Sequence, residues 1–189
     1  MLLTRLKDET RELHERVERN LALLERAPSA DEYRPLLWKF YRFYRPAEAA
    51  LAAVPWGALG FDFDSRRKAP LLERDLTALG ATRAALDGAG GAALPPLDTV
   101  PRALGCLYVL EGATLGGQVL TRHMSGAPGG PLPGAFFASY GADVGTMWKT
   151  FRAFLTAYSE RAGGDDEIVR SAHRTFEALG AVLAGENRP

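Results

Sequence analysis

The sequence lacks the features that mark several specialised classes of protein. It has one cysteine in 189 residues, which excludes an internal disulfide framework and suits a reducing compartment. Its 23 basic and 23 acidic residues balance, so the whole molecule carries no field that would attract nucleic acid or an anionic membrane. No apolar run reaches the length of a membrane span, about 18 residues, and the charged start of the chain is unlike a signal peptide. We therefore expect a cytoplasmic protein that binds neither nucleic acid nor membrane.

Alternating strand patterns and internal repeats are also missing, whereas helical spacing recurs along the chain. In residues 3–24 the apolar side chains follow one another at intervals of three and four, as on one face of a helix. Residues 29–32, SADE, have the form of a capping box and predict the start of an aromatic-rich second helix. Pro46 should kink or end this helix, although the alanine-rich continuation to Val54 suggests more helix beyond it. The sequence thus predicts an all-α fold, one domain over residues 1–189, with later helices at 66–79, 101–124, 144–162 and 165–183.

One stretch, residues 107–118 (LYVLEGATLGGQ), combines an apolar helical pattern with three glycines. Each glycine inside a helix costs about 1 kcal/mol relative to alanine, so three of them close together need a reason. Gly112 and Gly116 are four residues apart, as are Ala113 and Gly117, and this spacing gives a helix two neighbouring rows with almost no side chains. Such a strip can pack against another helix or lie against a flat ligand. Spacing alone favours helix packing.

Motifs for most metal and phosphate sites are missing. None of the three histidines has a glutamate three residues before it, which argues against a diiron helical bundle. The cysteine and histidine spacing of zinc sites is absent, and so is the Gly-x-x-x-x-Gly-Lys loop that binds phosphates. No serine is marked as the nucleophile of a Ser/His/Asp triad. What remains is one helical histidine and the glycine-rich stretch.

His14 stands at the edge of the apolar stripe of residues 3–24. Lys7 and Arg11 lie on the preceding turns of the predicted helix, and Glu18 lies one turn later. A flat, mostly apolar dianion with a metal at its centre would use all of these groups, and haem fits that description. Neutral imidazole can ligate the iron, small residues can admit the opposite face of the macrocycle, and cations can pair with its propionates. A lone helical histidine is, however, more often structural than a ligand.

Two segments of the chain resemble the haem oxygenase family. Residues 6–18, LKDETRELHERVE, are similar to the proximal helix of these enzymes, whose pattern is roughly L-[KR]-x-x-T-x-x-x-H-x-x-x-E. Residues 107–118 resemble their distal helix and end in the same Gly-Gly-Gln. The two motifs stand in the family's order, and the resemblance extends to the tyrosine-rich second helix and to residues 172–176. It is closest to bacterial members, some of which supply bilin to bacterial phytochromes.

The resemblance implies a fold, a reaction and partners. The fold would be a haem-oxygenase-like helical bundle that holds haem b between a proximal N-terminal helix and a glycine-kinked distal helix. The reaction would be the oxidative cleavage of haem to biliverdin, with release of carbon monoxide and ferrous iron. It uses O2 and electrons from an external donor, either a ferredoxin or a reductase. A bacterial phytochrome is a candidate acceptor of the bilin. Balanced charge, with no apolar stripe left over, makes a monomer the default expectation.

The family's proximal roles can be carried over residue by residue. His14 would be the iron ligand, and Glu18 would orient it, because a carboxylate that accepts a hydrogen bond from the other ring nitrogen fixes the tautomer. Further along the chain, an arginine in WKTFR resembles the later-helix arginine that the family uses near the propionates. The cations expected to serve the propionates are therefore Lys7, Arg11, Arg152 and, as a further candidate, Lys149.

The distal helix departs from the family's pattern at one position. Gly112, Gly116 and Gly117 would form the wall over the iron. Many family members have an aspartate directly after the first of these glycines, where it anchors a water that delivers protons. This chain has Ala113 there. Thr114, or a water held by backbone carbonyls, is the expected substitute.

Ala113 keeps a second hypothesis open, in which the same fold binds or delivers haem or a bilin without turnover. A third hypothesis is a helical scaffold that binds no tetrapyrrole and uses its aromatic second helix to contact another protein. Formation of biliverdin separates the first hypothesis from the second. A haem spectrum that depends on His14 separates both of them from the third.

Overall fold

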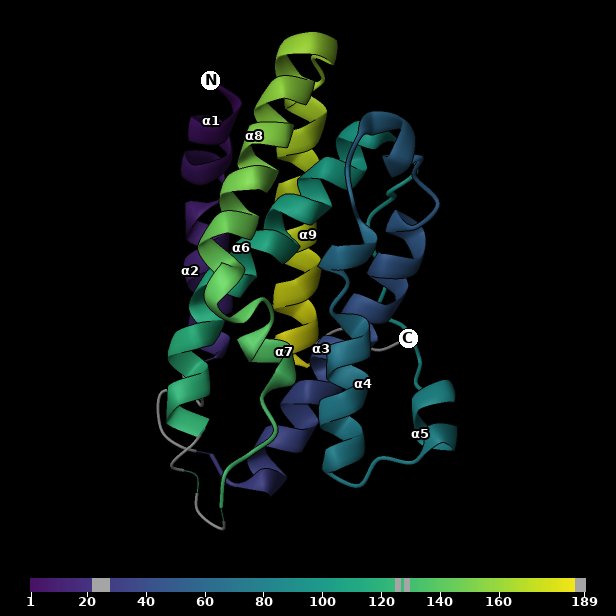
Figure 1. Cartoon of the computed structure of the whole chain (residues 1–189), viewed down its shortest axis with the longest axis vertical. Helices are drawn as coiled ribbons and strands as arrows, with labels where there is room; N and C mark the ends of the chain where they lie inside the picture. The colour runs from purple at the N-terminus through teal and green to yellow at the C-terminus, as the bar shows by residue number, and fades with distance from the viewer. Residues whose placement is uncertain (22–27, 125–126, 128–129, 186–189) are drawn as a thin grey trace.

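Helices form where the sequence shows helical spacing, as the computed structural model in Figure 1 shows. The structure describes the whole chain except residues 22–27, 125–126, 128–129 and 186–189. Of residues 118–120 and 122–124 it describes the backbone and not the side chains. The described residues contain no strand, so the prediction of an all-α fold is confirmed. The α-helices are α1 (Leu2–Glu9), α2 (Arg11–Asn20), α3 (Ala30–Leu51), α4 (Ala69–Ala78), α5 (Arg83–Asp87), α6 (Val100–Met124), α7 (Ala135–Ala138), α8 (Val144–Ala162) and α9 (Asp165–Ala184), and the 3-10 turns are η2 (Trp56–Leu59), η3 (Asp64–Arg66) and η4 (Gly141–Asp143).

The first helix of the sequence prediction is divided in two. Thr10 has φ −103° and ψ 1°, outside the helical region, and it separates α1 from α2. Its buried hydroxyl donates a hydrogen bond to the Leu6 carbonyl (2.7 Å), a local bond that competes with regular helix geometry and often bends a helix. The apolar spacing continues across the break, because Leu6 and Val17 are both buried. The predicted residues 22–24 lie outside the described part of the chain.

The second helix begins as predicted and continues through its internal proline. Ser29 and Glu32 form the complete capping box at the start of α3. Pro46 has no N–H to offer the Arg42 carbonyl one turn earlier. That carbonyl accepts instead from the backbone N–H of Ala92, at 2.8 Å, so the carbonyl remains hydrogen-bonded and the helix runs on to its end.

Two carboxylates accept hydrogen bonds from the backbone at the starts of the short helices α4 and α7. Glu48 of α3 accepts a hydrogen bond from the backbone N–H of Lys68, just before α4. Asp75 of α4 accepts from the backbone N–H groups of Ala135 and Phe136 (2.9 and 2.8 Å) at the start of α7. Because the first N–H groups of a helix lack partners within it, such contacts stabilise its start and fix its direction.

The long helices α6 and α9 pack against each other through the middle of the molecule. α9 also contacts α1 and α2 on one side and α3 on the other, as the yellow helix at the centre of Figure 1 shows. A Cβ atom at Gly105 of α6 would lie only 2.3 Å from the carbonyl oxygen of Ile168 on α9. A glycine is required there for the close crossing. None of the described helices is long and apolar enough to span a membrane.

Candidate functional site

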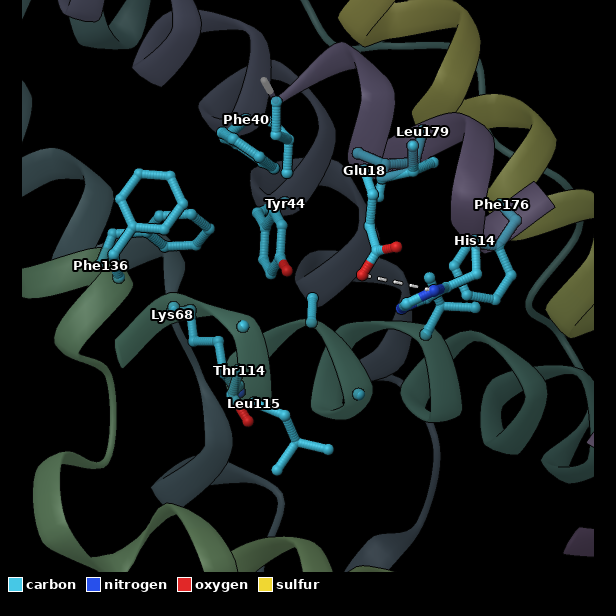
Figure 2. Close-up of a pocket in the computed structure, with 18 residues that line it drawn as sticks. His14, Glu18, Phe40, Tyr44, Lys68, Thr114, Leu115, Phe136, Phe176 and Leu179 are labelled. Atoms are coloured by element: carbon cyan, nitrogen blue, oxygen red, sulfur yellow. Dashed lines mark ion pairs between the residues drawn. The ribbon is translucent and has the colours of Figure 1, made fainter. Parts of the chain in front are cut away.

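A cavity of about 560 Å³ lies between α2 and α6, and Figure 2 shows the residues around it. Its volume falls in the range of small-molecule and cofactor sites, about 300–1,000 Å³. α2 contributes His14 and Glu18, while α6 contributes residues 109 and 112–117. The rest of the lining is mostly aromatic or aliphatic, with Phe40 and Tyr44 from α3, Phe136 and Phe137 from α7, and Phe176 and Leu179 from α9. The structure therefore brings the two motifs singled out in the sequence to opposite sides of one apolar cavity.

His14 is held in place by two neighbours. Its ring packs edge-on against Phe176 of α9, with ring centroids 5.8 Å apart. Its Nδ1 atom lies 3.6 Å from a carboxylate oxygen of Glu18, one turn later on α2, as the dashed line in Figure 2 shows. That distance is longer than a direct hydrogen bond, but it places the negative charge on the Nδ1 side of the ring. Because Glu18 lies on the Nδ1 side, Nε2 is the ring nitrogen without a carboxylate beside it, and about half of the His14 side chain is exposed.

The three glycines of α6 line the cavity, but they have different surroundings. A Cβ atom at Gly116 would meet no atom within 4 Å, so this position is open toward the cavity. A Cβ atom at Gly117 would lie 2.3 Å from the backbone oxygen of Phe137, which means that α7 approaches α6 too closely for any side chain. At Gly112 the nearest atom would be in the Trp148 ring, at 3.9 Å. Close packing of α7 against α6 therefore explains why residue 117 is a glycine. It does not explain the glycine at 116, where a side chain would fit without contact.

The polar groups of the α6 side are sparse. Ala113 is exposed to the cavity and offers no polar atom. Thr114 is buried, and its hydroxyl donates to the Glu111 carbonyl (2.7 Å), so toward the cavity its oxygen can only accept a hydrogen bond. Tyr44 of α3 is different, because its hydroxyl points into the cavity (Figure 2) and makes no hydrogen bond with the described residues. Burial raises the pKa of Tyr44, which keeps this hydroxyl protonated and able to donate.

The cations expected near the propionates lie outside the cavity. Lys7 and Arg11 are exposed on α1 and α2 and do not line it. Lys149 and Arg152 are exposed on α8, where they border a separate shallow groove. α8 nevertheless reaches the cavity wall, because Trp148 is the neighbour of Gly112. Of the helices that carry these cations, α2 lines the cavity and α8 approaches it at Gly112, but none of the four side chains belongs to the lining.

A buried charged cluster behind the α6 wall was missed by the sequence analysis. Lys68 lines the cavity and is almost fully buried, as are Arg66 and Glu111. The Lys68 ammonium donates to a carboxylate oxygen of Glu111 at 2.8 Å, and Arg66 donates to the other oxygen. The hydroxyl of Tyr140 donates to Glu111 at 2.6 Å. The sequence held one signal for this cluster: Glu111 stands inside an apolar helical stretch, and a buried carboxylate needs hydrogen-bonding partners.

Comparison with known proteins gives the same family for the whole chain. A family model described as "heme oxygenase" matches residues 1–184. A heme oxygenase from Xanthomonas campestris pv. campestris (strain 8004) is 28% identical over 160 residues, which cover 85% of this chain and 93% of that protein. Residues 1–184 include α2, which carries His14, and α6, which carries the three glycines.

Proposed function

The chain belongs to the haem oxygenase family of enzymes, and we propose that it binds haem between α2 and α6 with His14 as the iron ligand. Haem and O2 are the substrates that the family implies. The observation that carries the proposal is the placement of a carboxylate-flanked histidine opposite an open glycine wall, across an apolar cavity. The finer assignments below rest on the same placement.

The lining of the cavity fits haem. The macrocycle is flat and apolar, and the rings of Phe136, Phe137 and Phe176 offer apolar contact around it. Gly116 adds no side chain on the α6 side, so the space between the helices stays open. Among the described lining residues, His14 and Lys68 are the ones with a side-chain nitrogen, and the three N–H donors of Lys68 are all used within the protein. The imidazole is therefore the proposed ligand.

Bound haem supplies the redox chemistry, while the protein binds, orients and shields it. Glu18 beside Nδ1 favours the tautomer that leaves the Nε2 lone pair free for iron, and it keeps the ring oriented. The aromatic residues exclude bulk water from the macrocycle. The propionates would lie at the mouth of the cavity, where we assign Lys7, Arg11, Lys149 and Arg152 as their candidate partners.

Proton supply needs an alternative to the aspartate that Ala113 replaces. We propose that Tyr44 donates a hydrogen bond to a water in the cavity and that the oxygen of Thr114 accepts one from it. Support comes from the Tyr44 hydroxyl, which is protonated and has no hydrogen-bond partner among the described residues, and from the Thr114 oxygen, which donates its proton to the Glu111 carbonyl and can still accept. A water with two polar partners in an otherwise apolar space is a position where ordered water is stable.

The proposed partners follow from the reaction. Electrons come from outside the protein, and a ferredoxin or a reductase is the proposed donor. The likeness of the two motifs to bacterial members that make bilin for phytochromes supports a bacterial phytochrome as the proposed acceptor of the product. We propose that the chain works as a monomer, since the haem cavity is assembled from elements of a single chain.

Turnover of haem tests the proposed function. When haemin-loaded protein is mixed with ferredoxin, ferredoxin reductase, NADPH and catalase, we expect the Soret band to decay while a broad bilin band grows at longer wavelength. Catalase removes free peroxide, so the decay reports chemistry inside the protein. The absence of an acidic side chain at Ala113 favours one second candidate, a haem- or bilin-binding protein. For that function the Soret band would persist under reduction, and absence of any Soret band would contradict both.

A further inference from the structure

A carboxylate lies in the interior of the protein directly before the glycine wall. Glu111 precedes Gly112 on α6, and only 1% of its side chain is exposed. Removing an isolated carboxylate from water is very unfavourable, so its partners are structural necessities. Arg66, Lys68 and Tyr140 supply them, and we call these four side chains the Glu111 clamp.

The clamp is a closed network. An ammonium group has three N–H donors. Those of Lys68 go to the Arg66 carbonyl, the Glu111 carboxylate and the Tyr140 hydroxyl, each at 2.8 Å. The hydroxyl proton of Tyr140 goes to Glu111. Although Lys68 lines the cavity, it therefore has no donor left for a ligand, and the clamp can act on the cavity only through the position of Glu111.

The clamp joins four parts of the fold at one turn of α6. Lys68 immediately precedes α4, and Tyr140 lies in the connection between α7 and η4. Arg66, at the end of η3, also donates to the Met147 carbonyl (3.1 Å) and to the hydroxyl of Thr150 (2.9 Å), both on α8. The turn that is held in this way carries the wall. α7 packs on this wall at Gly117 and α9 packs along α6, while Gly112 and Gly116 have no side chains of their own to hold the turn. The clamp adds a polar anchor at Glu111, directly before Gly112.

We infer that the Glu111 clamp positions the glycine wall relative to haem and thereby determines which meso carbon is cleaved. The inference rests on the proposed function, because it concerns where the reacting edge of the macrocycle meets the wall. Tyr140 and Arg66 are positioning residues, since neither lines the cavity. Lys68 is treated as one too, because its three donors are all used within the protein although its side chain lines the cavity. Small displacements of a wall that confines the reacting groups have large effects on rate and outcome.

Tyr140→Phe tests the inference with the smallest change. It removes the hydroxyl that bridges Lys68 and Glu111 but keeps the ring, whose centroid lies 4.5 Å from the Lys68 nitrogen. We expect a mixed set of biliverdin isomers where the wild type gives one dominant isomer, and a fall in kcat of about tenfold with little change in KM for haem. The carbon monoxide stretching frequency of the reduced, CO-bound protein should also shift, because it reports the surroundings of the distal ligand.

Tyr41→Phe is the matched control. It removes the hydroxyl of a buried tyrosine that, like Tyr140, donates to a carboxylate: the acceptor is Glu73 (2.9 Å), and neither residue lines the cavity. Its isomer pattern and CO frequency should equal those of the wild type. A second variant, Thr150→Val, weakens the tie between Arg66 and α8 at an exposed position and nearly keeps the size of the side chain. It should shift the isomer ratio in the same direction as Tyr140→Phe, by less.

The outcomes separate the inference from the function on which it rests. Unchanged isomer ratios and CO frequencies in both Tyr140→Phe and Thr150→Val would overturn the inference and leave the haem oxygenase function intact. Equal changes in the Tyr41→Phe control would also overturn it, because the effect would then be one of general stability. A wild-type protein that forms no biliverdin would contradict the proposed function itself.

Discussion

Replacing His14 with alanine removes the sharp Soret band of the haemin-loaded protein and weakens haem binding by more than about 100-fold. The magnitude follows from metal sites in which loss of a residue that only orients a ligand already costs about 10- to 100-fold in affinity. His14 is the proposed ligand itself, since its side chain lines the cavity and Glu18 lies on its Nδ1 side. A titration of apoprotein with haemin, followed by absorption, measures the change. Added imidazole should restore the band, because it can occupy the position that the variant leaves open.

His173→Ala is the matched control for this prediction. His173 has the same local arrangement on α9, with its Nδ1 3.5 Å from the carboxylate of Glu177 one turn later and a side chain that is about half exposed. It does not line the cavity. Haem binding by this variant should equal that of the wild type. If His14→Ala retained a wild-type Soret band, the iron would have another ligand and the proposed site would be wrong.

Alanine at two adjacent glycines should have opposite effects on stability. Gly117→Ala forces the backbone of α7 away from α6, because the new Cβ would lie 2.3 Å from the Phe137 oxygen. Overpacking of this kind costs about 1–3 kcal/mol, or more where backbone must move. It outweighs the gain in helix propensity of about 1 kcal/mol. Gly116→Ala keeps that gain, because its Cβ meets nothing within 4 Å, and should raise the free energy of unfolding by up to about 1 kcal/mol.

Urea unfolding of the two apoprotein variants measures their free energies of unfolding. A haemin titration of Gly116→Ala then measures its affinity for haem. Its Cβ would occupy space on the cavity side of α6, so haem should bind more weakly although the apoprotein is more stable. This combination is the signature of a position kept small for a ligand. A Gly117→Ala variant with unchanged stability, or a Gly116→Ala variant that loses stability, would contradict the separate roles that the surroundings of the two glycines indicate.

Most of the fold could be predicted from the sequence, because helical spacing and caps are local signals. The capping box at Ser29 is an example, and the structure shows both of its hydrogen bonds. The failures lie where a distant residue decides the outcome. α3 does not end at Pro46, in keeping with the further helix that the alanine-rich residues after it suggested, but the sequence could not show that Ala92, far along the chain, bonds the carbonyl that the proline leaves open. The break at Thr10 was hidden because threonine fits the apolar stripe as well as it fits a bend.

The candidate site was only partly visible in the sequence. His14 and the glycines could be found because each stands out from the local pattern around it. Spacing could not show that Gly117 faces α7 and Gly116 the cavity, since both rows of the helix look alike without a neighbour. Lys68 and Tyr140 carry no local signal for a site. They meet Glu111 across 43 and 29 positions of sequence, so only the tertiary fold brings them together.

The structure of the protein with haemin bound is the most direct measurement of where haem lies. We predict that the iron is bonded to Nε2 of His14, that Glu18 remains on the Nδ1 side, and that the opposite face of the macrocycle lies against Gly112 and Gly116. Iron bonded to another residue, or a macrocycle seated in the groove on α8 beside Arg152, would contradict the proposed site.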